Sequence, residues 1–326
     1  MRALGALAES GDTRASAEVM ALASGLSRSD DPADRRAAAT AFSRRGTMEP
    51  DRTVLAHLLD DPDLSVRAAA LDAVAPDDSV DAEIVHRVVA AVRVARLGAR
   101  ATAAVGRLGE AAVAPLGAEV ARGDVPRPAS LVRAAAAMTP DHGIWIVQPA
   151  LDDRDRVVVL AALDSLDAAR GGELLEPGVL EPLLLDATAL AERAYAARAA
   201  LADYDASLVR ALADEINLAR RLVIAVLALR HGEGIRAAVR VVDCEEGARR
   251  ALAVEALDVV LSRREAAIAL PLVSRDLTLK ERPADSRRTG WPAHQPEEWI
   301  ADIAGDPEGI WRSPWLAACA LHATER

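Results

Sequence analysis

A cluster of three carboxylates is the first feature of this sequence with the potential for chemistry. The stretch LLDDPDLSVRAAALDAV, residues 58–74, places Asp60, Asp61 and Asp63 within four positions. Such a cluster is able to hold a divalent cation, but a calcium loop spreads its oxygen ligands over about a dozen residues with a glycine at the bend. Pro62 and the helical pattern after it leave no room for such a loop. We therefore expect these aspartates to cap the next helix by accepting hydrogen bonds from its free backbone amides.

The same carboxylate pattern recurs along the chain. The segment LDDPDLSVRAAALDAV from Leu59 has a near copy, LDDRDRVVVLAALDSL, from Leu151, and a third copy, DDPADRRAAATAF, begins at Asp30. A catalytic site needs to occur only once, whereas a structural cap recurs with each repeat. The recurrence therefore favours cap chemistry. It also predicts that an aspartate in one turn pairs with an arginine of the adjacent unit, which gives Arg67 a structural role.

The histidines and cysteines lack the spacing of a metal or catalytic centre. None of the six histidines occurs in an HExxH pattern or in a His-Glu pair. Cys244 and Cys319 stand 75 residues apart without a CxxC pattern. We expect both cysteines to be small core residues in a reducing cytosol, and His57 and His86 to lie at the surface or at an interface. No cofactor and no metal is predicted.

One segment of the chain is strongly basic. No acidic residue occurs between Ile84 and Gly109, and residues 84–140 hold eight arginines against three acids, while residues 141–190 hold three arginines against ten acids. One interpretation is that these arginines occupy repeat positions and solvate a helix face. The other is a site for an anion or an acidic protein partner. For the second interpretation the predicted contact residues are Arg87, Arg93, Arg96 and Arg100.

Nucleic acid is an unfavourable partner for this segment. Residues 84–140 contain no Trp, Tyr or Phe on which a base would stack, and the whole chain carries a net charge of −11. We therefore predict a protein partner, an acidic one if the basic segment binds it.

The elements that carry these residues are predicted to be paired helices. Arginines followed by small residues recur at Arg36, Arg67, Arg100 and Arg133, with spacings of 31, 33 and 33, and Val159 takes the corresponding place in the fifth unit. Apolar residues within each unit recur at steps of three and four, which is the period of a helix. Two helices in a repeat of just over thirty residues are typical of an α-solenoid, in which each pair buries its apolar face against its neighbours.

The segment LLDDPDLSVRAAALDAV resembles the HEAT repeat, whose turn carries an aspartate and whose second helix opens with Val-Arg and small residues. The resemblance is also recognisable in the units around residues 30, 151 and 250, and it is weak over 171–232, where one long helical run blurs the boundary. It implies an all-α, right-handed solenoid of about nine helix pairs over residues 1–275. It says almost nothing about activity.

The C-terminal part of the chain differs in composition. Residues 276–295 are polar, contain Pro283, Gly290 and Pro292, and are predicted to form a long loop. Residues 296–326 are predicted to form a capping helix pair sealed by Trp299, Trp311 and Trp315. This end is similar to HEAT segments that accompany ATP/ADP-translocase-like and cyclic-nucleotide-binding modules in bacterial multidomain proteins, which implies a regulatory role.

The expected function is that of a non-catalytic scaffold or adaptor that binds a protein partner. The alternative is a HEAT-like enzyme of the lyase or DNA-repair glycosylase type, which a deep pocket with convergent titratable groups would favour. The longest apolar stretch, residues 222–229, is about half of what a bilayer span needs, so a cytoplasmic protein without membrane insertion is expected.

Overall fold

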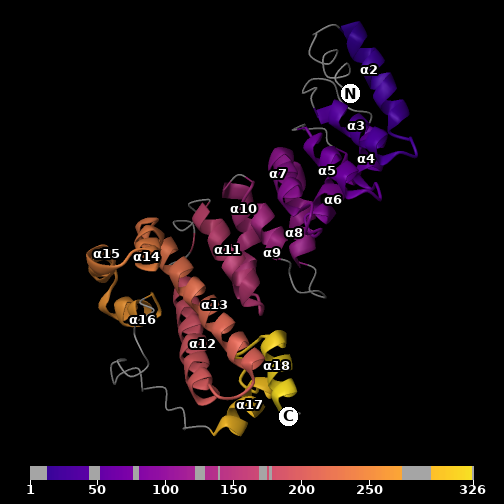
Figure 1. Ribbon diagram of the computed structural model, residues 1–326. Coiled ribbons are helices and arrows are strands. Elements are labelled where there is room, and N and C mark those ends of the chain that lie inside the picture. The colour runs from indigo at the N-terminus through magenta and orange to yellow at the C-terminus, as the bar shows by residue number, and fades with distance from the viewer. Residues whose placement is uncertain are drawn as a thin grey trace. The chain divides into compact units, whose positions relative to one another are not determined.

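The computed structural model describes residues 13–43, 52–75, 81–121, 129–138, 140–168, 175, 178–273 and 295–324. Its regular elements within these ranges are all helices, so the all-α prediction is confirmed (Figure 1). No helix in the described ranges is both long enough and apolar enough to span a membrane. The predicted loop at 276–295 lies outside the described residues, apart from Gln295.

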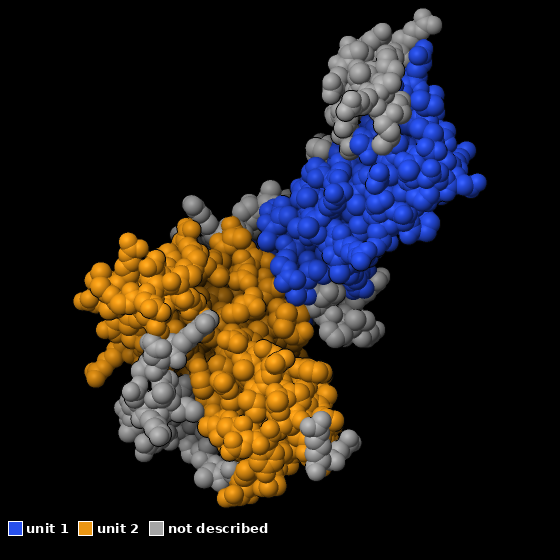
Figure 2. Space-filling view, viewed as in Figure 1, with its two compact units in different colours: residues 1–153 blue, residues 154–326 orange. Residues whose placement is uncertain are grey.

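The chain divides into two compact units, residues 1–153 and 154–326 (Figure 2). The helices described in the first unit are α2 (Thr13–Leu26), α3 (Pro32–Ser43), α4 (Arg52–Leu59), α5 (Leu64–Asp72), α6 (Ala82–Ala91), α7 (Gly98–Leu108), the 3₁₀ turn η1 (Gly109–Ala112), α8 (Val113–Ala121), α9 (Ala129–Ala135), α10 (Pro140–Val147) and the 3₁₀ turn η2 (Gln148–Asp152).

The helices of the first unit pack in two rows. One row runs α3, α5, α7, α9 and the other runs α4, α6, α8, α10, with each helix packed against the next in its row. The rows are joined by contacts between α4 and α5, α6 and α7, and α8 and α9. In the second row a pair of buried apolar residues recurs one turn apart, as at Val54 and Leu55 and then Leu58 and Leu59 in α4. This period places the apolar side chains on one face of the helix, where the other row covers them.

Two glycines allow helices of the first unit to approach closely. A Cβ atom on Gly106 of α7 would lie 2.8 Å from the carbonyl oxygen of Ala137, and one on Gly143 of α10 would lie 2.7 Å from that of Ala135. Cβ atoms in proteins do not come so near an oxygen. Both positions therefore require glycine, which has no Cβ atom.

The second unit is organised around two long antiparallel helices. Its helices are α11 (Arg156–Ala168), α12 (Leu180–Ala200), α13 (Ala206–His231), α14 (Gly234–Cys244), α15 (Gly247–Val260), α16 (Arg263–Val273), α17 (Pro296–Gly305) and α18 (Pro314–Thr324). The 26-residue helix α13 packs against α11, α12, α14, α16 and α18. It begins at the cap residue Asp205 and ends at Gly232, whose φ of 90° a side chain would resist.

The C-terminal helices α17 and α18 pack together, but only two of the three tryptophans predicted to seal them are buried. Helix α17 begins with Pro296 and a capping box between Gln295 and Glu298. Trp299 and Trp311 are buried and meet edge to face, with ring centroids 6.4 Å apart. Trp315 is 65% exposed, so the prediction that it seals the last unit is wrong. It is the second residue of α18, and the face that α18 buries is instead made by Leu316, Cys319 and Ala320.

The two cysteines also differ from each other. Cys319 is buried, as expected, but Cys244 is exposed at the last position of α14, so the prediction that it is a core residue is wrong. Helix α14 buries Ile235, Val239 and Val242, a spacing that leaves Cys244 on another side. His57 and His86 are exposed, as predicted for surface residues.

Candidate functional site

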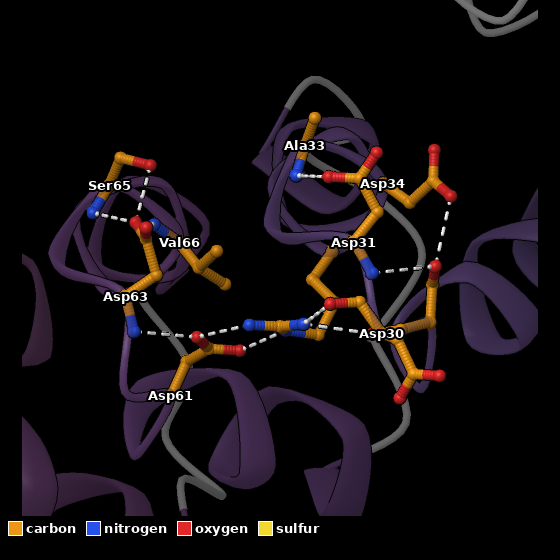
Figure 3. Close-up of polar contacts among 10 residues, drawn as sticks. Asp30, Asp31, Ala33, Asp34, Asp61, Asp63, Ser65 and Val66 are labelled. Carbon is orange, nitrogen blue, oxygen red and sulfur yellow. Dashed lines mark hydrogen bonds and ion pairs between the residues drawn. The ribbon is translucent and has the colours of Figure 1, made fainter.

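Asp61 and Asp63 are engaged in structural contacts (Figure 3). Asp61 is only 3% exposed, and its carboxylate accepts hydrogen bonds from Arg35 Nε at 2.6 Å, Arg35 Nη2 at 3.1 Å and the backbone amide of Asp63 at 2.8 Å. Asp63 caps α5 by accepting from the backbone amides of Ser65 and Val66. No group of three His, Cys, Asp or Glu side chains in the described residues is placed to hold a metal ion. The cap prediction is confirmed for Asp63, whereas Asp61 accepts from the amide of that cap residue and Asp60 binds Arg87 instead.

The electrostatics of this turn follow from the same contacts. Burial alone would raise the pKa of Asp61, but the hydrogen bonds from Arg35 and from the Asp63 amide outweigh it, and the pKa is lowered. Hydrogen bonds from the hydroxyl and the amide of Ser65 likewise lower the pKa of Asp63. Both carboxyls are therefore held ionised, as caps at the positive end of a helix should be.

The same cap chemistry occurs at other helix starts. Aspartates accept hydrogen bonds from backbone amides two residues further on at the starts of α3, α6, α11 and α13; these residues are Asp31, Asp81, Asp155 and Asp205. A residue type that recurs at one structural position in both units has a structural role, and this recurrence is what separates it from a catalytic one.

Arginines join neighbouring helix pairs, as the repeat predicted, although not at Arg67. Arg35 binds Asp61, and the next pair holds Arg87 against Asp60 at 2.6 Å. Arg107 of α7 donates to the carbonyl oxygens of Leu71 and Val74, at the end of α5. Within the described part of the chain, the buried Nε atom of Arg67 has no hydrogen-bond partner. The ladder is therefore made by arginines at other positions of the repeat.

The four arginines predicted to contact a partner do not form one cluster of free charges. Arg87 of α6 binds Asp60 and Glu83, Arg93 binds Glu119 of α8 at 3.0 Å, and Arg100 of α7 binds Asp72 of α5 at 2.9 Å. Arg96 is exposed and has no ion pair among the described residues. An acidic partner would thus have to compete with internal carboxylates at three of the four positions.

In the second unit, buried arginines hold the C-terminal pair. Arg193 of α12 binds Asp302 in a bidentate contact, at 3.1 and 2.7 Å, and Glu308 at 2.8 Å. Its guanidinium group also lies 5.8 Å from the centre of the Trp311 ring, and the indole of Trp311 donates to Asp302. These contacts of Arg193 with Asp302, Glu308 and Trp311 indicate a clamp between α12 and the segment 302–311.

A second buried arginine reinforces this clamp. Arg156 of α11 binds both oxygens of Asp186, and its remaining nitrogen donates to the carbonyl oxygens of Ile310 and Trp311. Burial raises the pKa of the nearby Glu215 carboxyl, and a hydrogen bond from Ser313 only partly offsets this effect.

The opposite end of α13 carries a third network. Arg230 lies between Glu265 of α16, at 2.9 Å, and Glu181 of α12, at 3.0 Å, while His231 Nε2 lies 3.1 Å from Glu265. Burial would raise the pKa of Glu265, but hydrogen bonds from Ser262, Arg230 and His231 lower it to about 2. Sequence reasoning missed these networks. Their one visible signal was a charged residue inside an apolar helical stretch.

The most exposed tryptophan of the described residues lies on α10. Trp145 is 75% exposed, whereas the next two residues, Ile146 and Val147, are buried. The exposed residues just before the equivalent buried pairs of α4 and α6 are Thr53 and Glu83. The repeat therefore accepts polar residues at this position, and an aromatic one is unnecessary for packing. Sequence reasoning did not single out Trp145, although its departure from the repeat was visible.

Neither the models of known protein families nor the curated proteins give a match to this chain.

Proposed function

We propose that the protein is a non-catalytic scaffold of paired helices, similar to HEAT repeats, that binds a protein partner. The two rows of helices in residues 1–153 and the recurring aspartate caps support this proposal, since both are properties of a stacked repeat. A continuous right-handed solenoid of about nine pairs is part of the same proposal. The similarity of the C-terminal end to segments of transporter-associated and nucleotide-sensing proteins supports a regulatory role.

The exposed side chain of Trp145 is the observation that carries the proposal. Trp is enriched among the residues that dominate protein–protein affinity, because a large apolar side chain with one polar N–H gains much from being covered. At an equivalent position in the same array, other units carry Thr53 or Glu83. A tryptophan that the repeat does not need and that water surrounds is best explained by contact with another protein.

The charge of the partner follows from the arginines near this array. Arg96 is exposed without an internal acid in the described residues, and Arg100 is about half exposed in its pair with Asp72. An acidic segment of the partner would gain from Arg96 directly and from Arg100 by replacing a weak surface pair. We therefore propose a partner with an apolar contact for Trp145 and acidic groups that meet Arg96 and Arg100.

The test compares two tryptophans that are both exposed. Full-length chain is used to capture its partner from the native cell, and the affinity of the isolated partner is then measured by calorimetry for the unaltered chain, Trp145→Ala and Trp315→Ala. We expect Trp145→Ala to weaken binding about tenfold or more, as for the central residue of an interface. Trp315→Ala, which removes a similar exposed side chain from the second unit, should bind as the unaltered chain does.

Equal affinities for the unaltered chain and Trp145→Ala would contradict the proposal. Arg96→Glu should weaken binding of the partner more at low salt than at high salt, because salt screens the interaction between exposed charges. If Arg96→Glu does not change the affinity at any salt concentration, the proposal that the partner is acidic is wrong.

A further inference from the structure

Helix α15 has an unusually small buried face. Of its fourteen residues, only Ala253 and Leu257 are buried. It packs chiefly against α14 and α16, whereas α13 packs against helices on several sides. Most of the surface of α15 is therefore open to water.

The helix pair that follows in the chain does not cover this surface. Helix α17 packs on α12, and α18 packs on α13 and α17. Tyr204, in the connection between α12 and α13, donates a hydrogen bond to Glu297 of α17, whereas Arg230 at the other end of α13 contacts Glu265 of α16. The pair α17–α18 thus lies at one end of the long helices and the group α14–α16 at the other, as Figure 1 shows.

An apolar stripe runs along the open side of α15. Ala248, Leu252, Ala256 and Val259 follow one another at steps of four, four and three residues, which return to one side of a helix. All four are exposed, Leu252 by 64% and Val259 by 80%. The stripe spans about 16 Å, the length of three helical turns. Apolar side chains in this order are the pattern of a helix that packs against another helix.

One edge of the stripe is acidic. Glu255 and Asp258 are both exposed, and neither has an ion pair in the part of the chain that the structure describes. The other edge carries Arg249, which is bound to Glu245 at 3.4 Å. The charge that is free to meet a partner is therefore negative and lies on one side of the apolar residues.

We propose that α15 is a docking site for an amphipathic helix of a partner protein that carries apolar residues on one face and lysine or arginine along one edge. The basic edge would lie beside Glu255 and Asp258 and the apolar face would cover Leu252 and Val259. Two copies of α15 packed antiparallel would instead bring their acidic edges together, because equivalent edges meet in such a pair, and like charges repel. This site is in the second unit and does not depend on the binding role of Trp145.

The test uses two designed peptides and the full-length chain. Both are fluorescein-labelled helices with leucine at positions i, i+4, i+7 and i+11; one carries lysine along one edge, and the other carries glutamate at the same places. Binding is followed by fluorescence anisotropy. We expect the lysine peptide to bind about tenfold more tightly than the glutamate peptide, and the paired change Leu252→Ser with Val259→Ser to weaken it about tenfold. Leu22→Ser, which alters a leucine of α2 that is 51% exposed, should leave binding unchanged.

A charge reversal distinguishes this site from a merely sticky surface. With Glu255→Lys and Asp258→Lys, the preference should invert in favour of the glutamate peptide. Equal binding of both peptides, binding that survives the Leu252 and Val259 changes, or no binding at concentrations up to about 1 mM would overturn the proposal. Sedimentation velocity gives a further test. A dimer of the unaltered chain together with a monomer of the Leu252→Ser, Val259→Ser variant would also overturn the proposal, because a second copy of the chain would then cover α15.

Discussion

At the scale of single residues, arginine side chains join helices that are distant in sequence. Arg35 reaches Asp61 across 26 residues, and Arg193 reaches Asp302 across 109. Each guanidinium group makes a bidentate contact, and in both cases the acid is mostly buried. Removing the partner of a buried charge lowers the free energy of unfolding far more than removing the partner of an exposed one. These two contacts therefore contribute more to stability than surface ion pairs do.

The first prediction compares two adjacent aspartates. Asp61→Ala would remove the acceptor of Arg35 and of the Asp63 amide, and we expect a loss of about 2–4 kcal/mol in the free energy of unfolding in urea. Asp60→Ala removes an exposed partner of Arg87, which keeps Glu83, and should cost less than about 1 kcal/mol. Similar losses for the two variants would show that burial does not set the strength of the ladder.

The second prediction concerns pH and the Glu265 carboxyl. Its pKa is lowered from 4.5 to about 2 in the folded chain. The folded state therefore binds this proton less readily than the unfolded state does. The resulting stability is fully present above about pH 5 and is lost as the pH falls through 4 towards 2.

Glu265→Gln provides the measurement for that prediction. The unaltered chain should be the more stable at pH 7, and the difference in unfolding free energy should shrink steadily between pH 5 and pH 2.5. The comparison is made by urea unfolding at each pH. A difference that stays constant over this range would mean that the contacts of Arg230 and His231 do not depend on the charge of Glu265.

At the scale of elements, caps and helix breakers set where helices begin and end. The aspartate caps and the Pro296 start were readable from the sequence because they depend on neighbouring residues only. The length of α13 was less apparent, although no Gly or Pro interrupts residues 206–231. The exposure of Trp315 and Cys244 was not readable, because it depends on which side of a helix is covered by elements far away in sequence.

The third prediction tests the close approach of helices in the first unit. Gly106→Ala and Gly143→Ala each place a Cβ atom under 3 Å from a carbonyl oxygen of α9 or the residues after it. Alanine favours a helix by about 1 kcal/mol over glycine, but the clash should outweigh this and destabilise each variant by about 1–3 kcal/mol. Gly25→Ala in α2 meets nothing within 4 Å and should be neutral or stabilising. The stability of the three variants is measured by thermal unfolding. Equal changes in stability for all three would contradict the close packing at Gly106 and Gly143.

At the scale of the whole molecule, the two units differ in how far sequence spacing predicts them. In residues 1–153 the main contacts of each helix are with the next helix or the next but one in the chain, so the repeat of the arginine and alanine pattern anticipates them. In residues 154–326 the pair α17–α18 returns to α12 and α13, past the intervening α14–α16. Contacts such as Arg193 with Asp302 join residues with no shared motif, so the sequence predicts the helices but not this return. The exposed Trp145 and the exposed stripe of α15, which we propose as partner surfaces, were missed for a related reason, since exposure is a property of the folded array.

The last prediction asks whether that return depends on the buried arginine. Arg193→Met keeps the apolar stem but leaves Asp302 and Glu308 without their cation and Trp311 without its cation–π contact. We expect a loss of about 3–5 kcal/mol in the free energy that holds α17–α18 in place. Hydrogen exchange should then quicken in residues 296–324, and Trp fluorescence should shift to the red as Trp299 and Trp311 meet water, while amides of α4–α9 keep their protection.

Arg312→Met serves as the control, because Arg312 lies in the same segment but is exposed and 3.6 Å from its acidic partner Asp186. Faster exchange spread evenly over the second unit, or an equal effect of Arg312→Met, would mean that the apolar contacts of α18, not the clamp, hold the C-terminal pair.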